Sequence, residues 1–210
     1  MSIPEGTTTT DIARTISTTT ATAPVYNYQL ITNASDKIVA IYNTTAGGSS
    51  LNSTVCSNRG QYPSGQGPTM CIDFLNTTHL NYGNTVVGQS SSTAGVGTGV
   101  FTIPVLGPTI VRAIQFTIGG DALNRDPFTI TLEGSNTTDS ALSVGFSWTL
   151  LYSGEAGFNS DSNSVIRYYL GQKQNFTNNL AFTAYCILVT SQRSSDDCTQ
   201  FSEMHLFSLI

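Results

Sequence analysis

The stretch Ile110–Asn136, IVRAIQFTIGGDALNRDPFTITLEGSN, decides the fold that we predict. Two runs of alternating apolar residues, Val111–Ile118 and Phe128–Leu132, are joined by the polar loop Gly119–Pro127. Alternation with a period of two is typical of a strand that buries one face. The loop ends in Pro127, which cannot donate a hydrogen bond to a sheet ladder. The stretch therefore predicts two strands of a β-sandwich and a charged loop at one end of the sheets.

The composition extends this prediction to the rest of the chain. Charged residues make up 10% of the 210 residues, against roughly a quarter in an average domain. Thr, Ser, Asn and 19 Gly take their place, which favours an all-β protein with many turns. The length suits one sandwich, so we expect a single domain over residues 25–210. Further strands are expected at residues 25–31, 37–42, 100–106, 146–152, 165–170, 180–190 and 201–210.

Residues 1–24 form a Thr-rich arm that we treat as a separate unit. Thr favours extended backbone, and Pro24 stops any helix. Two interpretations stay open. The arm is either a disordered or O-glycosylated tail, or an extended strand that pairs with the sheet edge of a neighbouring molecule.

Several features indicate an extracellular glycoprotein. A net charge of −5 and a pI near 4.7 argue against a nucleic-acid partner, because phosphates need a basic surface. No apolar run approaches the ~20 residues that span a bilayer. The opening residues lack the pattern of a signal peptide, so we expect one to have been removed before Met1. Six Asn-X-Ser/Thr glycosylation sequons are present, at Asn33, Asn43, Asn52, Asn76, Asn136 and Asn175.

The four cysteines fit the same oxidising compartment. Cys56 and Cys71 bracket a Gly/Pro-rich loop, and Cys186 and Cys198 bracket a polar loop between two apolar runs. Among the three possible connectivities we predict these sequential disulfides, Cys56–Cys71 and Cys186–Cys198. No CxxC pattern is present, which argues against zinc or redox chemistry.

Five motifs in order resemble those of extracellular galactose-binding-like domains, which are discoidin-related jelly rolls. The segment GGDALNRDPFTITLEGSN resembles the family's Arg-Asp-Pro loop and its Leu-Glu-Gly-Ser-Asn strand end. The resemblance covers residues 55 to 210 and implies a jelly-roll β-sandwich, here preceded by an extended N-terminal arm. The other four motifs are Tyr62–Pro68, Ile72-Asp73 with His79–Gly83, Trp148–Leu151, and Ser202–Phe207.

The resemblance also implies one structural Ca²⁺. Family members hold it with an Asp and a Thr from one loop and a Glu from the last strand. Carried over to this sequence, the ligands are Asp73, Thr78 and Glu203, all hard oxygen donors suited to Ca²⁺. Where the family has a Gly after the Asp, this chain has Phe74.

Two functions remain open at this stage. The Thr-rich arm, the sequons and the low charge favour a self-assembling structural protein, a fibre or matrix subunit linked to itself through the arm. The fold resemblance favours a carbohydrate-binding module instead. No catalytic constellation is found, since His79 and His205 lie outside any HExxH motif, and we expect no enzyme. Candidate ligand residues in loops are Tyr62, Tyr82, Asp121, Arg125, Asp126 and Phe158. For the aromatic residues packing is the better interpretation, and for the charged residues a charge-balanced structural cluster is.

Overall fold

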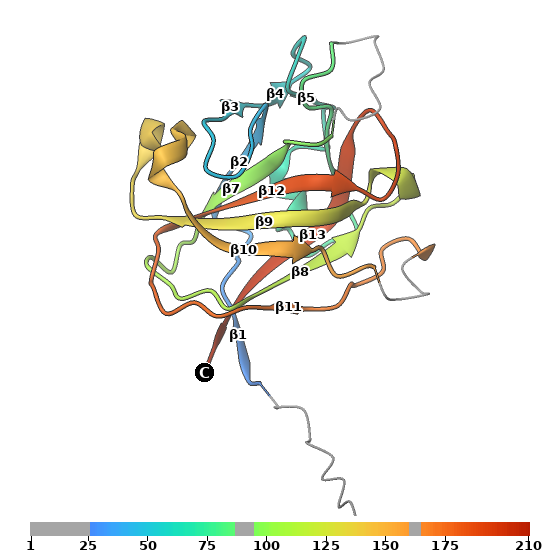
Figure 1. Ribbon diagram of the computed structural model, residues 1–210. Helices are drawn as coiled ribbons and strands as arrows, with labels where there is room; N and C mark the ends of the chain where they lie inside the picture. Colours follow the sequence, from blue (N-terminus) through green and yellow to red (C-terminus); the bar gives the residue numbers. More distant parts are fainter. Residues whose placement is uncertain (1–25, 87–94, 160–164) are drawn as a thin grey trace, which may run out of the picture.

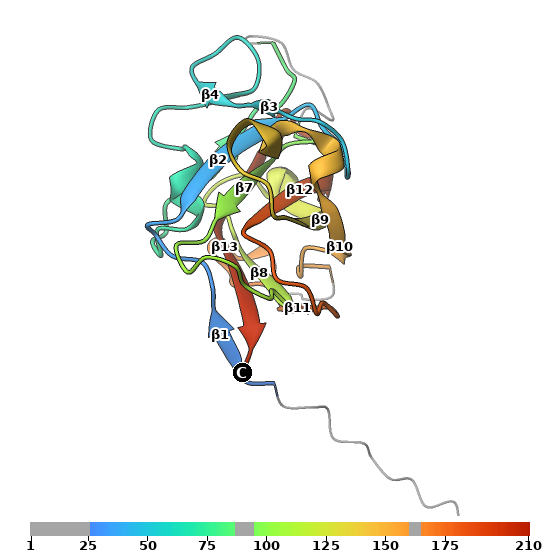
Figure 2. The ribbon, with the colours of Figure 1, turned by 90° about the vertical axis from the view of Figure 1, so that its left-hand side faces the viewer.

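The computed structural model describes residues 26–86, 95–159 and 165–210, and its two main sheets are antiparallel and lie face to face (Figures 1 and 2). One sheet has the order β1 (Tyr28–Leu30), β13 (Thr199–Leu209), β8 (Ala113–Ile118) and β11 (Gln174–Asn175), and β6 (His79–Asn81) also pairs with β13. The other has the order β10 (Thr149–Glu155), β9 (Pro127–Ser135), β12 (Ala184–Gln192), β7 (Gly99–Ile103), β2 (Lys37–Tyr42) and β3 (Leu51–Asn52).

Short elements complete the fold. Strands β4 (Thr54–Val55) and β5 (Gln61–Tyr62) form a small parallel pair. Four short 3₁₀ turns also lie in the described ranges: η1 (Pro68–Cys71), η2 (Leu123–Arg125), η3 (Asp139–Ser143) and η4 (Gly145–Ser147). The predicted all-β jelly-roll sandwich is confirmed.

The main core lies between the two sheets and follows from the alternation of the opening stretch. Ile114, Phe116 and Ile118 of β8 have no exposed surface, and neither have Ile130 and Leu132 of β9. The register pairs Phe116 with Met204 and Leu132 with Ile187, so both strands bring their apolar faces to the same core. Burial of such side chains contributes about 1.5–3 kcal/mol each.

A second, smaller core covers the outer face of the β9-containing sheet. Leu142 of η3 packs with Phe101 of β7, and Cys186 and Leu188 of β12 belong to the same cluster. Trp148 packs against this cluster and donates its indole N–H to the Leu142 carbonyl at 3.0 Å. The segment between β9 and β10 therefore acts as a cover over a sheet face that would otherwise be exposed.

The disulfide prediction is wrong, since all four cysteines are free thiols. Cys186 lies near the start of β12, whereas Cys198 accepts a hydrogen bond from Gln192 at the end of that strand. Cys186 and Gln192 are six residues apart on this strand, so at about 3.3 Å per residue their Cα atoms are roughly 20 Å apart. A disulfide needs Cα atoms about 6 Å apart. Cys71 points into the main core and donates to the Pro68 carbonyl, while Cys56 is exposed.

One further strand prediction fails. Residues 165–170 are not a strand, because they form a turn in which Leu170 makes only an isolated bridge to Thr117. The N-terminal arm, residues 1–24, lies outside the described residues.

Candidate functional site

Three segments that are distant in the sequence meet at one end of the sandwich, on the right of Figure 1. We call residues 119–126, 165–170 and 193–198 the loop end. The backbone N–H groups of Arg193 and Ser194 donate to carbonyls of the first segment, at 2.9 and 3.3 Å. Arg167 donates to the Gly119 carbonyl at 3.2 Å and so attaches the second segment to the first.

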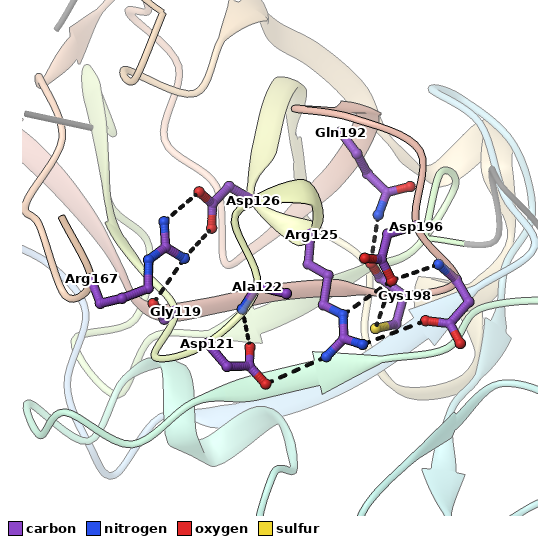
Figure 3. A network of polar contacts seen from close by, with 10 residues as sticks. Gly119, Asp121, Ala122, Arg125, Asp126, Arg167, Gln192, Asp196 and Cys198 are labelled. Carbon is purple, nitrogen blue, oxygen red and sulfur yellow. Dashed lines mark hydrogen bonds and ion pairs between the residues drawn. The ribbon is translucent and has the colours of Figure 1, made fainter. Parts of the chain in front are cut away.

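Arg125 is the centre of an ion network at the loop end (Figure 3). Its Nε donates to Asp196 at 3.1 Å, one Nη donates to Asp121 at 3.4 Å, and the other Nη lies 3.8 Å from the Asp197 carboxylate. Although burial opposes ionisation, hydrogen bonds from Asp197 and Arg125 lower the pKa of Asp196. Three carboxylates thus surround one guanidinium, which leaves this part of the surface negative.

Asp126 forms a second, buried ion cluster beside the first. Its side chain has no exposed surface, and its two oxygens accept from the two Nη atoms of Arg167 at 3.1 and 3.0 Å. Arg193 Nε donates to the same carboxylate at 3.2 Å. Burial raises the pKa of Asp126, although both arginines act in the opposite direction. This bidentate geometry fixes where residues 165–170 lie relative to β9.

Tyr82 and Cys198 border the Arg125 network. Burial raises the pKa of Tyr82, and the neighbouring Cys198, Asp197 and Asp121 add to the effect. The ligand atoms of Asp196, Asp197 and Cys198 lie within 4.8 Å of one another. Arg125 already supplies the positive charge there, and burial raises the pKa of the Cys198 thiol, so these groups are poorly suited to a metal ion.

The structure brings four of the six predicted ligand residues together and separates the other two. Asp121, Arg125, Asp126 and Tyr82 all lie at or beside the loop end. Phe158 is buried in the main core against Gly171, so it is no ligand residue. Tyr62 packs on the same core, 6.4 Å from the His79 ring.

Sequence reasoning missed the partners supplied by the other two segments. Arg167 is 41 residues from Asp126, and no periodicity connects them. The Asp196-Asp197 pair stands in a polar loop between two apolar runs. That pair was a signal that could have been noticed beside the charged 119–127 loop.

The predicted metal ligands Asp73 and Glu203 do come together, because both accept a hydrogen bond from the same backbone amide. The N–H of Leu75 donates to Asp73 Oδ1 and to Glu203 Oε1, each at 2.9 Å. Burial and then the adjacent Asp73 raise the pKa of Glu203 to about 8. Thr77, rather than Thr78, donates to Asp73 at 2.5 Å.

These residues fit a cation with oxygen ligands. Glu203 Oε2 is buried without a hydrogen-bond partner. The nearest cationic candidate is His205, whose Nε2 is 3.8 Å away and whose pKa is lowered by burial and by Lys173. Thr78 instead lies 3.4 Å from the Ser202 hydroxyl and is buried.

Comparison with solved structures finds the fold of this sandwich in carbohydrate-binding modules of other proteins. The CBM32-5 module of Clostridium perfringens, in complex with GalNAc-β-1,3-galactose, matches with a TM-score of 0.52 at 12% identity, over 86% of this chain and all of the module. The family 32 module of NanJ from the same organism, in complex with galactose, matches with a TM-score of 0.53 at 12% identity, over 87% and 100%. The fold is galactose-binding-like.

A third similar structure is the F5/8 type C domain of a Bacteroides fragilis protein, with a TM-score of 0.53 at 11% identity, over 87% of this chain and 97% of the domain. The resemblance found in the motifs is confirmed at the level of the galactose-binding-like fold. No protein-family model and no curated protein matches the sequence. None of the helical turns in the described ranges has the length and apolar character needed to cross a bilayer.

Proposed function

We propose that this chain is a carbohydrate-binding module and that it binds glycans at the loop end. The Arg125 network carries the proposal, because it presents ordered carboxylates and a guanidinium on loops of a galactose-binding-like sandwich. Charged groups held in fixed positions form strong hydrogen bonds with sugar hydroxyls. The solved neighbours in complex with galactose and GalNAc-β-1,3-galactose support a sugar as the ligand.

The charge balance favours neutral over anionic glycans. Three carboxylates face one guanidinium, whose Nε and one Nη are already engaged at 3.1 and 3.4 Å. A sialic acid or a sulfated sugar would meet this excess of carboxylates over guanidinium, and like charges across an interface act against binding.

The distribution of sequons agrees with this location. All six sequon asparagines are exposed, and none lies in the three segments of the loop end. N-glycans at these positions, as expected of an extracellular protein, would be attached outside the segments that bind the ligand. The hollow of about 320 Å³ near Tyr26 and Arg112 lies before the start of β8, whereas the loop end follows its last residue. Sequon Asn175 lines that hollow, which makes it the weaker candidate.

The fibre function that the sequence favoured is not supported. The neighbours are carbohydrate-binding modules, and the arm on which self-assembly depended lies outside the described residues. Hydrolysis of the glycan is not proposed either. It needs an accessible carboxylic acid that stays protonated, whereas the pKa of Asp196 is lowered and Asp126, whose pKa is raised, has no exposed surface.

We also propose that Asp73 and Glu203 hold a structural Ca²⁺, with the Thr77 hydroxyl, which donates to Asp73, as a neighbouring oxygen ligand. When bound, the ion would neutralise two facing carboxylates and connect the loop before β6 to β13. Its function would be to stabilise the domain rather than to contact the glycan.

Glycan-array binding of the full-length protein tests the proposed function. We expect binding to neutral glycans and weaker binding to their sialylated or sulfated forms. Arg125→Lys keeps the charge but loses the planar guanidinium, and we expect at least tenfold weaker binding by calorimetry. Arg59→Lys is the matched control, because Arg59 is exposed, lies outside the three segments of the loop end and donates to Asn84 at 3.2 Å. The proposal fails if no glycan binds, or if Arg125→Lys binds as tightly as Arg59→Lys.

A further inference from the structure

Tyr168 combines backbone strain with an exposed aromatic ring. Its φ of +58° is in the left-handed region, where a bulky residue is uncommon. The residue is 41% exposed, so core packing does not account for the conformation. Strain of this kind persists only where the surroundings enforce it, and it concentrates at functional sites.

Contacts on both sides of Tyr168 enforce its conformation. On one side, Arg167 is fixed by the buried Asp126 carboxylate, at 3.1 and 3.0 Å, and by the Gly119 carbonyl. On the other side, the Tyr169 carbonyl accepts the N–H of Ile118 at 3.0 Å. The backbone at Tyr168 is therefore clamped between two anchors on β8 and on the loop that follows it.

The ring is directed at the first segment of the loop end. A Cβ added to Gly120 would lie 2.3 Å from the Tyr168 hydroxyl, so the phenol rests against a backbone position that has no room for a side chain. Asp121, whose side chain is 59% exposed, is the next residue along that loop. An exposed aromatic face and a solvent-accessible carboxylate are thus adjacent.

This combination matches the two faces of a pyranose. The C–H groups of a sugar ring can pack on an aromatic face while its hydroxyls donate to a carboxylate. Other aromatic residues considered for this role are less suitable, because Phe158 is buried in the core and Tyr82 is partly buried beside Cys198. Val165, Ile166 and Leu170 are also exposed and extend the apolar surface around Tyr168.

We propose that Tyr168 is the aromatic platform on which a sugar ring of the glycan stacks, and that Arg167 is its positioning residue. The inference rests on the proposed function, since it assumes a glycan at the loop end. It adds a specificity requirement: the bound sugar presents an unsubstituted C–H face, and a hydroxyl at its edge donates to Asp121.

Calorimetry with the tightest glycan found on the array tests the platform. We expect Tyr168→Ala to weaken binding about tenfold, and Tyr168→Phe to bind within about threefold of the wild type, because the ring is retained. Tyr168→Gly should also weaken binding about tenfold but raise the melting temperature above that of Tyr168→Ala, because glycine adopts this φ without strain. Tyr26→Ala, another exposed tyrosine outside the loop end, is the control and should bind normally.

The positioning role has its own test. Arg167→Lys loses the bidentate contact with Asp126 but keeps the Tyr168 ring, so we expect this variant to bind the glycan more weakly than the wild type. The control Tyr26→Ala should bind as the wild type does. If the wild type binds a glycan and Tyr168→Ala binds it equally well, the platform is refuted while the proposed function stands. If the wild type binds no glycan, both the platform and the proposed function are refuted.

Discussion

Phe74 has a backbone conformation that glycine favours, with a φ of +63°. It stands where the motif resemblance implies a Gly after Asp73. Its ring stacks on His205, with centroids 5.2 Å apart and an angle of 20° between the planes. The contact offsets part of the strain and keeps Asp73 beside Glu203.

The facing carboxylates predict a calcium-dependent stability. At pH 8, we expect Ca²⁺ at a hundredfold excess over its Kd to stabilise the wild type by about 2.7 kcal/mol, seen as a higher melting temperature. The shift should shrink as the pH falls below 8, because the pKa of Glu203 is about 8 without the ion and protons then compete for the carboxylate. Glu203→Gln should abolish the shift, and Asp196→Asn should keep it. An equal Ca²⁺ response in Glu203→Gln would contradict the site.

His79 predicts a loss of stability in acid. The imidazole is fully buried, and burial lowers its pKa from 6.5 to about 4 in the folded protein. The unfolded chain therefore takes up a proton below pH 6.5 that the folded protein binds only near pH 4, so this residue destabilises the fold as the pH falls through that window. The contribution is about 3 kcal/mol at the acid limit. We expect His79→Gln to lose less unfolding free energy than the wild type between pH 6.5 and 4, measured by urea titration; an identical loss would contradict the assignment.

At the scale of elements, the turn between β8 and β9 is the part of the fold on which the loop end depends. Asp126 ends η2 and precedes the first residue of β9, and its carboxylate binds arginines from two other segments. One buried side chain thereby connects residues 119–126 with both 165–170 and 193–198.

We expect Asp126→Asn to lower the free energy of unfolding by about 3 kcal/mol, because it removes the anionic partner of two arginines. Asp121→Asn is the matched control, since that carboxylate is 59% exposed, and its change should stay within about 0.5 kcal/mol. Urea unfolding measures both variants. Equal destabilisation by the two substitutions would show that the buried cluster contributes no more to the free energy of unfolding than the exposed ion pair.

Elements were predictable from the sequence where their pattern is local. Residues 37–42 form a strand with the predicted bounds, because apolar alternation reports burial of one face directly. The VIRYYL run at residues 165–170 was wrongly predicted as a strand, since its apolar residues are exposed and a long-range ion pair sets its turn. The same difference between local and long-range contacts explains which residues of the candidate site could be predicted. Asp121 and Arg125 share one loop and were found together, whereas Arg167 comes from a segment that only the tertiary fold brings near.

At the scale of the whole molecule, the distribution of thiols replaces the predicted disulfide framework. Cys71, Cys186 and Cys198 are buried, and Cys56 alone is exposed. We expect a maleimide to label one thiol per chain in the native protein and four after denaturation without a reductant, counted by mass spectrometry. Reductant should leave the melting temperature unchanged, because the sandwich is held by its two cores. Fewer than four labelled thiols in the denatured protein would show that a disulfide had formed.

The proposed glycan site lies entirely within the described sandwich. The described sandwich begins with β1 at Tyr28, and every residue assigned to the loop end or to the metal pair comes after Lys37. Deleting residues 1–24 should therefore leave glycan affinity and the calcium response unchanged.

Calorimetry and thermal unfolding compare this deletion with the full-length protein, and sedimentation velocity compares their mass. Equal affinity and equal mass would show that binding resides in the sandwich. A loss of glycan binding on deletion would instead make the Thr-rich arm part of the site. A loss of assembly, with binding intact, would restore a structural role for the arm alongside the proposed carbohydrate binding.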